Sequence, residues 1–123
     1  DYRFSRSDIF SFTLFSVLGF VFAENVLYLT VTDTAFFDWI YRSIFTLIAH
    51  VFAASVCAYF WWKALSYELF SARYIATFLL GFALAIAAHT LYNIFSVSGS
   101  FLLLAIYVII GYMAFIVMGK HQR

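Results

Sequence analysis

The sequence has no proline, a single cysteine and few charged side chains. Without proline, no position loses the backbone donor that a continuous helix needs, so long uninterrupted helices are favoured. The one cysteine, Cys57, excludes an internal disulfide and any metal site built from several cysteines. Charged residues make up 11% of the chain, whereas they make up about 25% of a typical soluble domain. The chain therefore has too few charged side chains to cover the surface of a soluble protein.

The residues that are present indicate a membrane protein. Of the 123 residues, 66% are hydrophobic and 24% are aromatic, and the length allows one domain. This composition excludes a soluble globular enzyme and a disordered segment. The net charge of +1 provides no basic patch, so we expect no nucleic-acid partner. The sequence predicts an integral membrane protein that is surrounded by membrane lipid.

Four stretches have the roughly 20 apolar residues that a membrane-spanning helix requires. They cover about residues 8–30, 40–62, 74–97 and 99–119. We therefore expect an all-α fold, in which residues 1–123 form one transmembrane domain, a polytopic bundle of four membrane helices. The last two helices are separated by the short segment Ser96–Ser100, where Gly99 supplies the positive φ that an abrupt turn often requires.

The positions of lysine and arginine predict the orientation in the membrane. With four spans, six of the seven cations lie on the side that holds both ends of the chain, and Arg42 alone lies on the other side. The six are Arg3, Arg6, Lys63, Arg73, Lys120 and Arg123. Because lysine and arginine are enriched on the cytoplasmic side, we expect both ends in the cytoplasm, with the chain in the plasma or inner membrane. The polar start at Asp1 leads us to expect the C-terminal part of a longer chain, with an upstream segment or other subunits as partners.

Ionisable side chains inside the predicted spans are candidates for function, since burying them in lipid is costly. At a rise of about 1.5 Å per residue, Glu24 lies roughly 9 Å, His89 roughly 12 Å and His50 roughly 15 Å from the outer ends of their spans. Asn25 and Asn93 accompany them. Three separate helices thus place a carboxylate and two imidazoles in one layer in the outer half of the membrane.

Each of these ionisable residues also belongs to a row of side chains spaced four residues apart, which share one helix face. The rows are Phe20, Glu24 and Tyr28 in the first span, Arg42, Thr46, His50 and Ala54 in the second, and Gly81, Ala85, His89 and Asn93 in the third. Small residues allow membrane helices to approach closely. Because polar groups turned toward lipid would stay unpaired, we expect the three rows to face one another.

Two neutral imidazoles with a carboxylate or amide oxygen suit Zn²⁺ and leave an open position for water. We therefore predict a zinc site with His50 and His89 as ligands and Glu24 as general base or further ligand. The hydroxyl of Tyr28, about one turn from Glu24, is expected to bond the carboxylate or a substrate. A lone histidine inside a span is as often a structural hydrogen-bonding residue, and only the combination of groups favours the metal site.

Arg42 has two interpretations. It is either an anchor at the membrane interface or a partner of Asp38, or it acts directly by holding the substrate backbone or the developing negative charge. The sequence alone leaves both open.

Residues 19–29 read Gly-Phe-Val-Phe-Ala-Glu-Asn-Val-Leu-Tyr-Leu, and residues 85–93 read Ala-Ile-Ala-Ala-His-Thr-Leu-Tyr-Asn. With Arg42 and His50 between them, they resemble the Gly-Phe-Ala…Glu-Asn-x-x-Tyr, Arg…His and Ala…His-Gly-Leu-Tyr-Asn motifs of the PrsW family of intramembrane metalloproteases. The order and spacing agree over most of the chain. There are two departures: Thr90 stands in place of the family's glycine, and the family's earlier Glu-Glu-x-x-Lys helix has no counterpart in this sequence.

The resemblance implies a polytopic protease related to the CAAX-processing and bacteriocin-processing enzymes. We expect a zinc-dependent intramembrane endopeptidase that cleaves a membrane-anchored protein substrate near the outer face. The resemblance places His50 and His89 at metal-binding positions and Glu24 and Asn93 at catalytic ones. The residues expected to bind the substrate are Asn25, Tyr28 and Arg42.

Two other functions remain open from the sequence. The chain is alternatively a non-catalytic member of the fold that serves as a scaffold or binding subunit of a membrane complex. The third alternative is electron transfer, with His50 and His89 as the axial ligands of a b-type haem, since two histidines on facing helices are what such a site requires.

Overall fold

A computed structural model describes residues 4–33 and 35–120, and this part of the chain consists of four helices without any strand. The helices are α1 (Arg6–Val31), α2 (Phe36–Ala64), α3 (Ala72–Val97) and α4 (Phe101–Lys120). The predicted all-α fold with four helices is confirmed.

Local sequence signals set several of the helix ends. Ser5 caps α1 in a capping box, in which its hydroxyl accepts from the Asp8 backbone N–H and the Asp8 carboxylate accepts from the Ser5 backbone N–H. Ser71 caps α3 by accepting from the Tyr74 backbone N–H. Between α3 and α4, Gly99 has φ +66°, as predicted for this turn. Phe70, just before the α3 cap, also has a positive φ, of +62°.

One predicted boundary is wrong by about a turn, because α2 begins at Phe36 rather than near residue 40. The prediction assigned Asp38 to the connection, whereas the helix also includes the first turn Phe36-Phe37-Asp38-Trp39. Asp38 lies in that turn, where a carboxylate interacts favourably with the exposed N–H groups of a helix start. The helix therefore begins before the predicted span.

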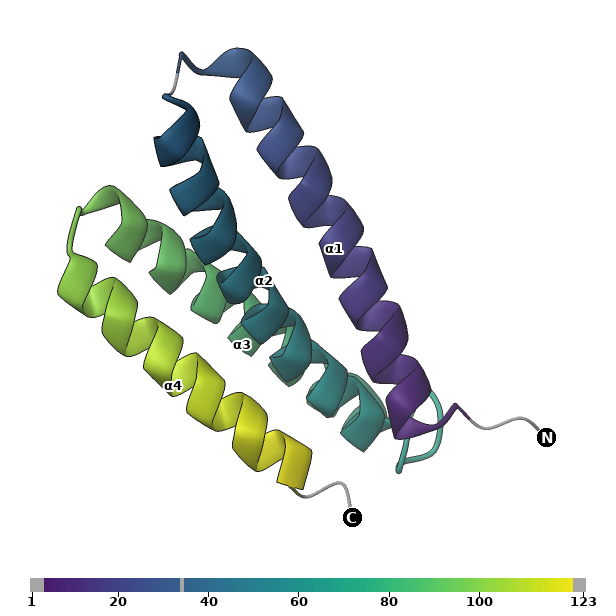
Figure 1. The fold of residues 1–123 in the computed structure, drawn as a ribbon. Helices are drawn as coiled ribbons and strands as arrows, with labels where there is room; N and C mark the ends of the chain where they lie inside the picture. Colours follow the sequence, from purple (N-terminus) through teal and green to yellow (C-terminus); the bar gives the residue numbers. More distant parts are fainter. Residues whose placement is uncertain (1–3, 34, 121–123) are drawn as a thin grey trace.

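The four helices run alternately up and down, with α2 at the centre (Figure 1). α1 lies on one side of α2, while α3 and α4 lie on the other and also contact each other. Within the described residues, the backbone of α1 comes close to α2 but to neither α3 nor α4. The start of α1, the α2–α3 connection and the end of α4 lie at one end of the bundle (Figure 1). Any side chains of α1 and α3 that meet must therefore do so across the face of α2.

Small residues allow α2 to approach its neighbours closely. The buried small side chains of α2 are Ala49, Ala53, Ala54, Ser55, Ala58 and Ala64. Gly81 of α3 is buried against Phe60 of α2, so near that an added Cβ would overlap the phenylalanine side chain. Gly111 of α4 faces Phe52, where an added Cβ would lie 3.0 Å from Cγ. The predicted row through Gly81 therefore does face α2.

Three helices are long and apolar enough to cross a membrane: Ser7–Val31, Phe36–Ala64 and Ala72–Ser96. In α4 the described apolar stretch is Leu102–Met113, which is shorter than a span requires. The chain is an integral membrane protein, but the fourth span stays a prediction.

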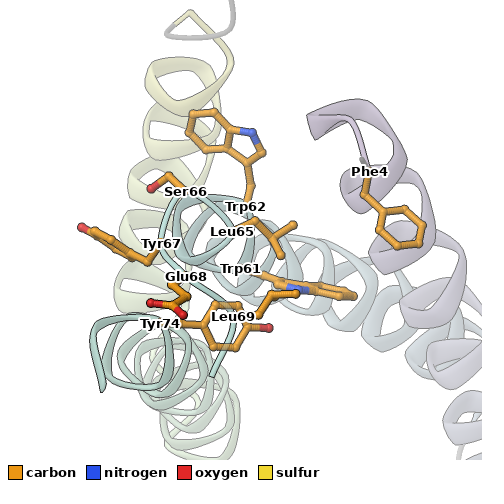
Figure 2. A pocket seen from close by; sticks show the side chains of 9 residues that line it. All are labelled: Phe4, Trp61, Trp62, Leu65, Ser66, Tyr67, Glu68, Leu69 and Tyr74. Carbon is orange, nitrogen blue, oxygen red and sulfur yellow. The ribbon is translucent and has the colours of Figure 1, made fainter. Parts of the chain in front are cut away.

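A cavity of about 800 Å³ lies at the end of the bundle where α2 connects to α3. Figure 2 shows its lining, which includes Trp61 and Trp62 from the end of α2, Tyr67 and Glu68 from the connection, and Tyr74 from α3. Trp61 is eleven residues from His50 along α2, a distance of about 16 Å at the helical rise. None of the predicted site residues lines this cavity.

Candidate functional site

Three ionisable side chains from three different helices meet beside the middle of α2. Glu24 comes from α1, His50 from α2 and His89 from α3. Glu24 Oε2 lies 3.3 Å from His50 Nε2, and the ring centroids of His50 and His89 are 4.4 Å apart. The convergence that the sequence predicted is therefore present, with the imidazole of His50 in the middle.

The backbone of α2 sets the orientation of the His50 ring. Its Nδ1 lies 2.8 Å from the carbonyl oxygen of Thr46, one helical turn earlier. Because a carbonyl only accepts, Nδ1 carries a proton and donates it, so in the neutral ring Nε2 has the free lone pair. The ring of Phe20, whose centroid is 5.5 Å from that of His50, covers it from α1. His50 thus presents Nε2 toward Glu24, at 3.3 Å from Oε2.

Several buried polar atoms at this point have no hydrogen-bond partner among the described residues. They are Glu24 Oε2, Arg42 Nη1, His50 Nε2 and His89 Nδ1. Unsatisfied buried polar atoms are rare in native proteins, since each one costs the free energy of its lost hydration. Glu24 Oε2 and His50 Nε2 are close neighbours whose geometry does not form a hydrogen bond. Two facing lone pairs of this kind suit a cation or a proton held between them.

The donor set has the chemistry of a zinc site without a complete coordination shell. Two imidazoles and a carboxylate are ordinary Zn²⁺ ligands. In the part of the chain that the structure describes, however, no three His, Cys, Asp or Glu side chains are arranged to hold a metal ion together. The position of α1 gives a reason: Glu24 approaches His50 across α2, while the backbone of α1 stays away from α3, which carries His89.

Arg42 extends the site toward the α1–α2 connection. Its Nη2 lies 3.9 Å from Glu24 Oε1, and its guanidinium carbon lies 3.6 Å from the centroid of the Tyr28 ring. The guanidinium is therefore held by a carboxylate and by the face of an aromatic ring. Of the interpretations left open by the sequence, the pairing of Arg42 with Asp38 is not found among the described side chains, where Arg42 pairs with Glu24. The ring of Tyr28 contacts Arg42, and no hydrogen bond joins its hydroxyl to Glu24 among the described residues.

Asn25 lies beside Glu24 but faces the contact between α1 and α2. Its Nδ2 donates to the Val21 carbonyl, and its Oδ1 accepts from the Ser43 hydroxyl at 3.0 Å. Its backbone carbonyl accepts from Trp39 Nε1. Asn25 is only 8% exposed, and both ends of its amide are bonded. These bonds hold α1 to α2 next to Glu24; the expected contact of Asn25 with substrate stays a prediction.

Asn93 lies on the same face of α3 as His89, one turn along. Its Nδ2 is 3.5 Å from His89 Nε2, close to the upper limit of a hydrogen bond. The residue as a whole is exposed on the surface of the bundle. Asn93 therefore contacts the histidine pair at its edge and keeps a second amide N–H for another acceptor.

Tyr92 was not singled out from the sequence as a site residue, and Thr46 was noted only as a member of its row. Their hydroxyl oxygens are 3.0 Å apart, which joins α2 to α3 beside the histidines. Tyr92 is part of the segment that resembles the family motif, and Thr46 precedes His50 by one turn. A search for hydroxyl residues one turn from each histidine would have found both.

One of the comparisons with known proteins gave a match. Residues 8–118 match a family model described as PrsW family intramembrane metalloprotease. The match includes Glu24, Arg42, His50, His89 and Asn93. Neither the curated proteins nor the solved structures gave a match to this chain.

Proposed function

Since the chain belongs to the PrsW family of intramembrane metalloproteases, we propose that it is a zinc-dependent endopeptidase that cleaves a membrane-anchored protein near the outer face of the membrane. The observation that carries the proposal is the buried contact between Glu24 and His50, with His89 against the same ring. Three ionisable groups from three apolar helices have no structural need to meet in lipid, where each is costly.

His50 and His89 would hold the zinc ion and would leave open positions for water and substrate. The unpartnered Nε2 of His50 supports this role, because in the neutral ring the proton on Nδ1 leaves Nε2 free to coordinate. When bound, zinc would supply two effects: a lowered pKa of its water and polarisation of the peptide carbonyl.

Glu24 would act as the general base. Its Oε2 is buried and has no hydrogen-bond donor among the described residues, so it can accept a proton from the attacking water. The same carboxyl group then returns that proton to the nitrogen of the leaving peptide. Its Oε1 stays near Arg42, which keeps the carboxylate aimed at His50.

Arg42, Tyr28 and Asn93 would bind the substrate around this base. Arg42 Nη1 is buried without an acceptor, so it has a donor available for the negative charge that develops on the peptide oxygen. The Tyr28 ring keeps the guanidinium in place. The second amide N–H of Asn93 provides a further donor at the edge of the histidine pair.

The two alternatives differ in how they fit the geometry. A haem between His50 and His89 requires a porphyrin between the rings, and ring centroids 4.4 Å apart leave no space for one. A non-catalytic scaffold has no use for unpartnered buried lone pairs. The protease is therefore the better account of the cluster.

The experiment compares His50→Ala and His89→Ala with the unchanged chain, each purified in detergent. Zinc is measured by elemental analysis, and cleavage is measured on a panel of single-span reporter peptides in liposomes. We expect about one zinc per chain and cleavage of at least one reporter before substitution, and loss of both in each variant, because each variant removes one of two proposed ligands.

His121→Ala is the matched control, since it removes the third histidine, which lies outside the described residues. It should retain zinc and activity. Normal cleavage by both His50→Ala and His89→Ala would falsify the proposal. Zinc binding without cleavage of any reporter would favour the scaffold.

A further inference from the structure

The polar contacts between α2 and α3 form two adjacent levels. Thr46 precedes His50 by four residues on α2, and Tyr92 follows His89 by three residues on α3. Because residues three or four apart share a helix face, Thr46 and Tyr92 meet one turn away from the pair of histidines. The Tyr92 ring is nearly parallel to the ring of His89, at 21° and 6.4 Å between centroids. One level holds two imidazoles and the next holds two hydroxyl groups.

The hydroxyl level is the more deeply buried of the two. Thr46 is 1% exposed and Tyr92 4% exposed, and their oxygens are 3.0 Å apart. Tyr92 is also packed among Ala49, Leu104 and Tyr107. Hydrogen bonds between membrane helices are modest in strength, but they require one particular distance and rotation of the two helices. The contact therefore sets how α2 and α3 are placed beside the histidines.

Thr46 is connected to His50 as well as to Tyr92. Its carbonyl oxygen accepts the Nδ1–H of His50 at 2.8 Å, while its hydroxyl contacts Tyr92. A shift of Thr46 relative to α3 would thus move the ring whose Nε2 faces Glu24. Loss of a group that bonds the far nitrogen of a metal-binding histidine typically weakens metal affinity by about 10- to 100-fold.

We propose that Thr46 and Tyr92 are positioning residues, whose hydroxyl contact holds the two imidazoles at the separation needed to bind zinc together. This inference rests on the proposed function, because it concerns the same metal. Tyr92 would affect zinc binding through Thr46 and His50, and it would not contact the substrate.

The test measures zinc affinity, by competition with a chromophoric chelator, in Thr46→Val, Tyr92→Phe and the double variant. Each single variant removes one hydroxyl and nearly conserves shape. Because the Thr46 carbonyl stays bonded to His50 in each variant, we expect the dissociation constant for zinc to rise by up to about 10-fold, the lower end of the effect of a lost outer-shell partner. Because both substitutions break the same contact, the double variant should bind zinc no less tightly than the single variant with the lower affinity. Thr46→Ser retains the hydroxyl, so its dissociation constant for zinc should lie within about threefold of that of the unchanged chain, a smaller change than a lost outer-shell contact gives.

Tyr107→Phe is the matched control. The Tyr107 hydroxyl is buried near Tyr92 but has no hydrogen-bond partner among the described residues, so its removal should leave zinc affinity unchanged. Unfolding in detergent is followed in parallel, since a merely structural role would lower stability without changing zinc affinity. Equal affinity in Tyr92→Phe and the unchanged chain, or effects that add in the double variant, overturns the inference alone. An unchanged chain that binds no zinc overturns the proposed function, and this inference with it.

Discussion

Glu24 has two carboxylate oxygens with different neighbours, and this difference organises the site. Oε1 faces Arg42 at 3.9 Å, and Oε2 faces His50 at 3.3 Å. The side chain is 32% exposed, so one part of it is open to the surroundings while Oε2 is buried. A single residue thus joins the cationic part of the site to the imidazole part.

Glu24→Gln tests whether this carboxylate is the base. The amide keeps the size of the side chain but accepts a proton poorly, so we expect the rate constant kcat on the reporter peptide to fall by about 10²- to 10⁴-fold. The zinc content should stay near that of the unchanged chain, because both histidines remain. Asp38→Asn is the control, since Asp38 is exposed and makes no ion pair with Arg42 in the described residues; it should cleave normally. A Glu24→Gln variant that cleaves at the normal rate would exclude the carboxylate as base.

At the scale of the helices, α2 determines the site because it is the element that contacts all three others. It supplies Thr46 and His50 from its buried face and Arg42 from a less buried turn. Its alanine-rich face and Gly81 of α3 allow the α2 and α3 backbones to approach, which brings His89 against His50. Small residues therefore allow these two helices to lie close together, from Ala49 beside His50 to Gly81, about two turns from His89.

Gly81→Ala tests the close approach of α3 to α2. The added methyl group would overlap Phe60, and overpacking of this kind costs about 1–3 kcal/mol, so we expect the free energy of unfolding to fall by that amount. The measurement is reversible unfolding in mixed detergent. Gly19→Ala is the matched control, because no atom lies within 4 Å of its added Cβ; alanine's better helix propensity should leave stability equal or slightly higher. Equal losses in the two variants would contradict the packing argument.

At the scale of the molecule, the bundle turns most of its large apolar side chains outward. Most large side chains of α1, α3 and α4 are exposed, including Phe22, Leu79 and Ile109. In lipid this arrangement is not costly, because the surrounding acyl chains are as apolar as these side chains. The polar side chains Glu24, His50 and His89, by contrast, meet one another beside α2. None of them lines the cavity at the α2–α3 connection.

The orientation of the bundle in the membrane is testable with single cysteines in a Cys57→Ala background. Asp33→Cys and Ser66→Cys place exposed thiols in the α1–α2 and α2–α3 connections. With the cytoplasmic ends predicted from lysine and arginine, a membrane-impermeant maleimide should label Asp33→Cys in intact cells and Ser66→Cys only after the membrane is opened. The reverse pattern would refute the predicted orientation. If α4 crosses the membrane, Ser98→Cys and a cysteine added after the last residue should be labelled from opposite sides.

The sequence by itself determined the membrane class, the four helices, the Gly99 turn and the rows of residues that carry Glu24, His50 and His89. It could do so because apolar length and a spacing of four residues are properties of one helix at a time. It also carried the family motifs, which are local runs of residues. The start of α2 was predicted less well, since the charged Asp38 indicated a connection, whereas the hydrogen-bonded helix includes it.

The tertiary structure decided which side chains are partners. Arg42 pairs with Glu24 instead of Asp38, Asn25 bonds Ser43, and Thr46 meets Tyr92. The spacing of residues fixes only the direction in which a side chain leaves its own helix. Contacts between helices depend also on the rotation, height and separation of two helices, and these are set by packing such as that of Gly81 on Phe60.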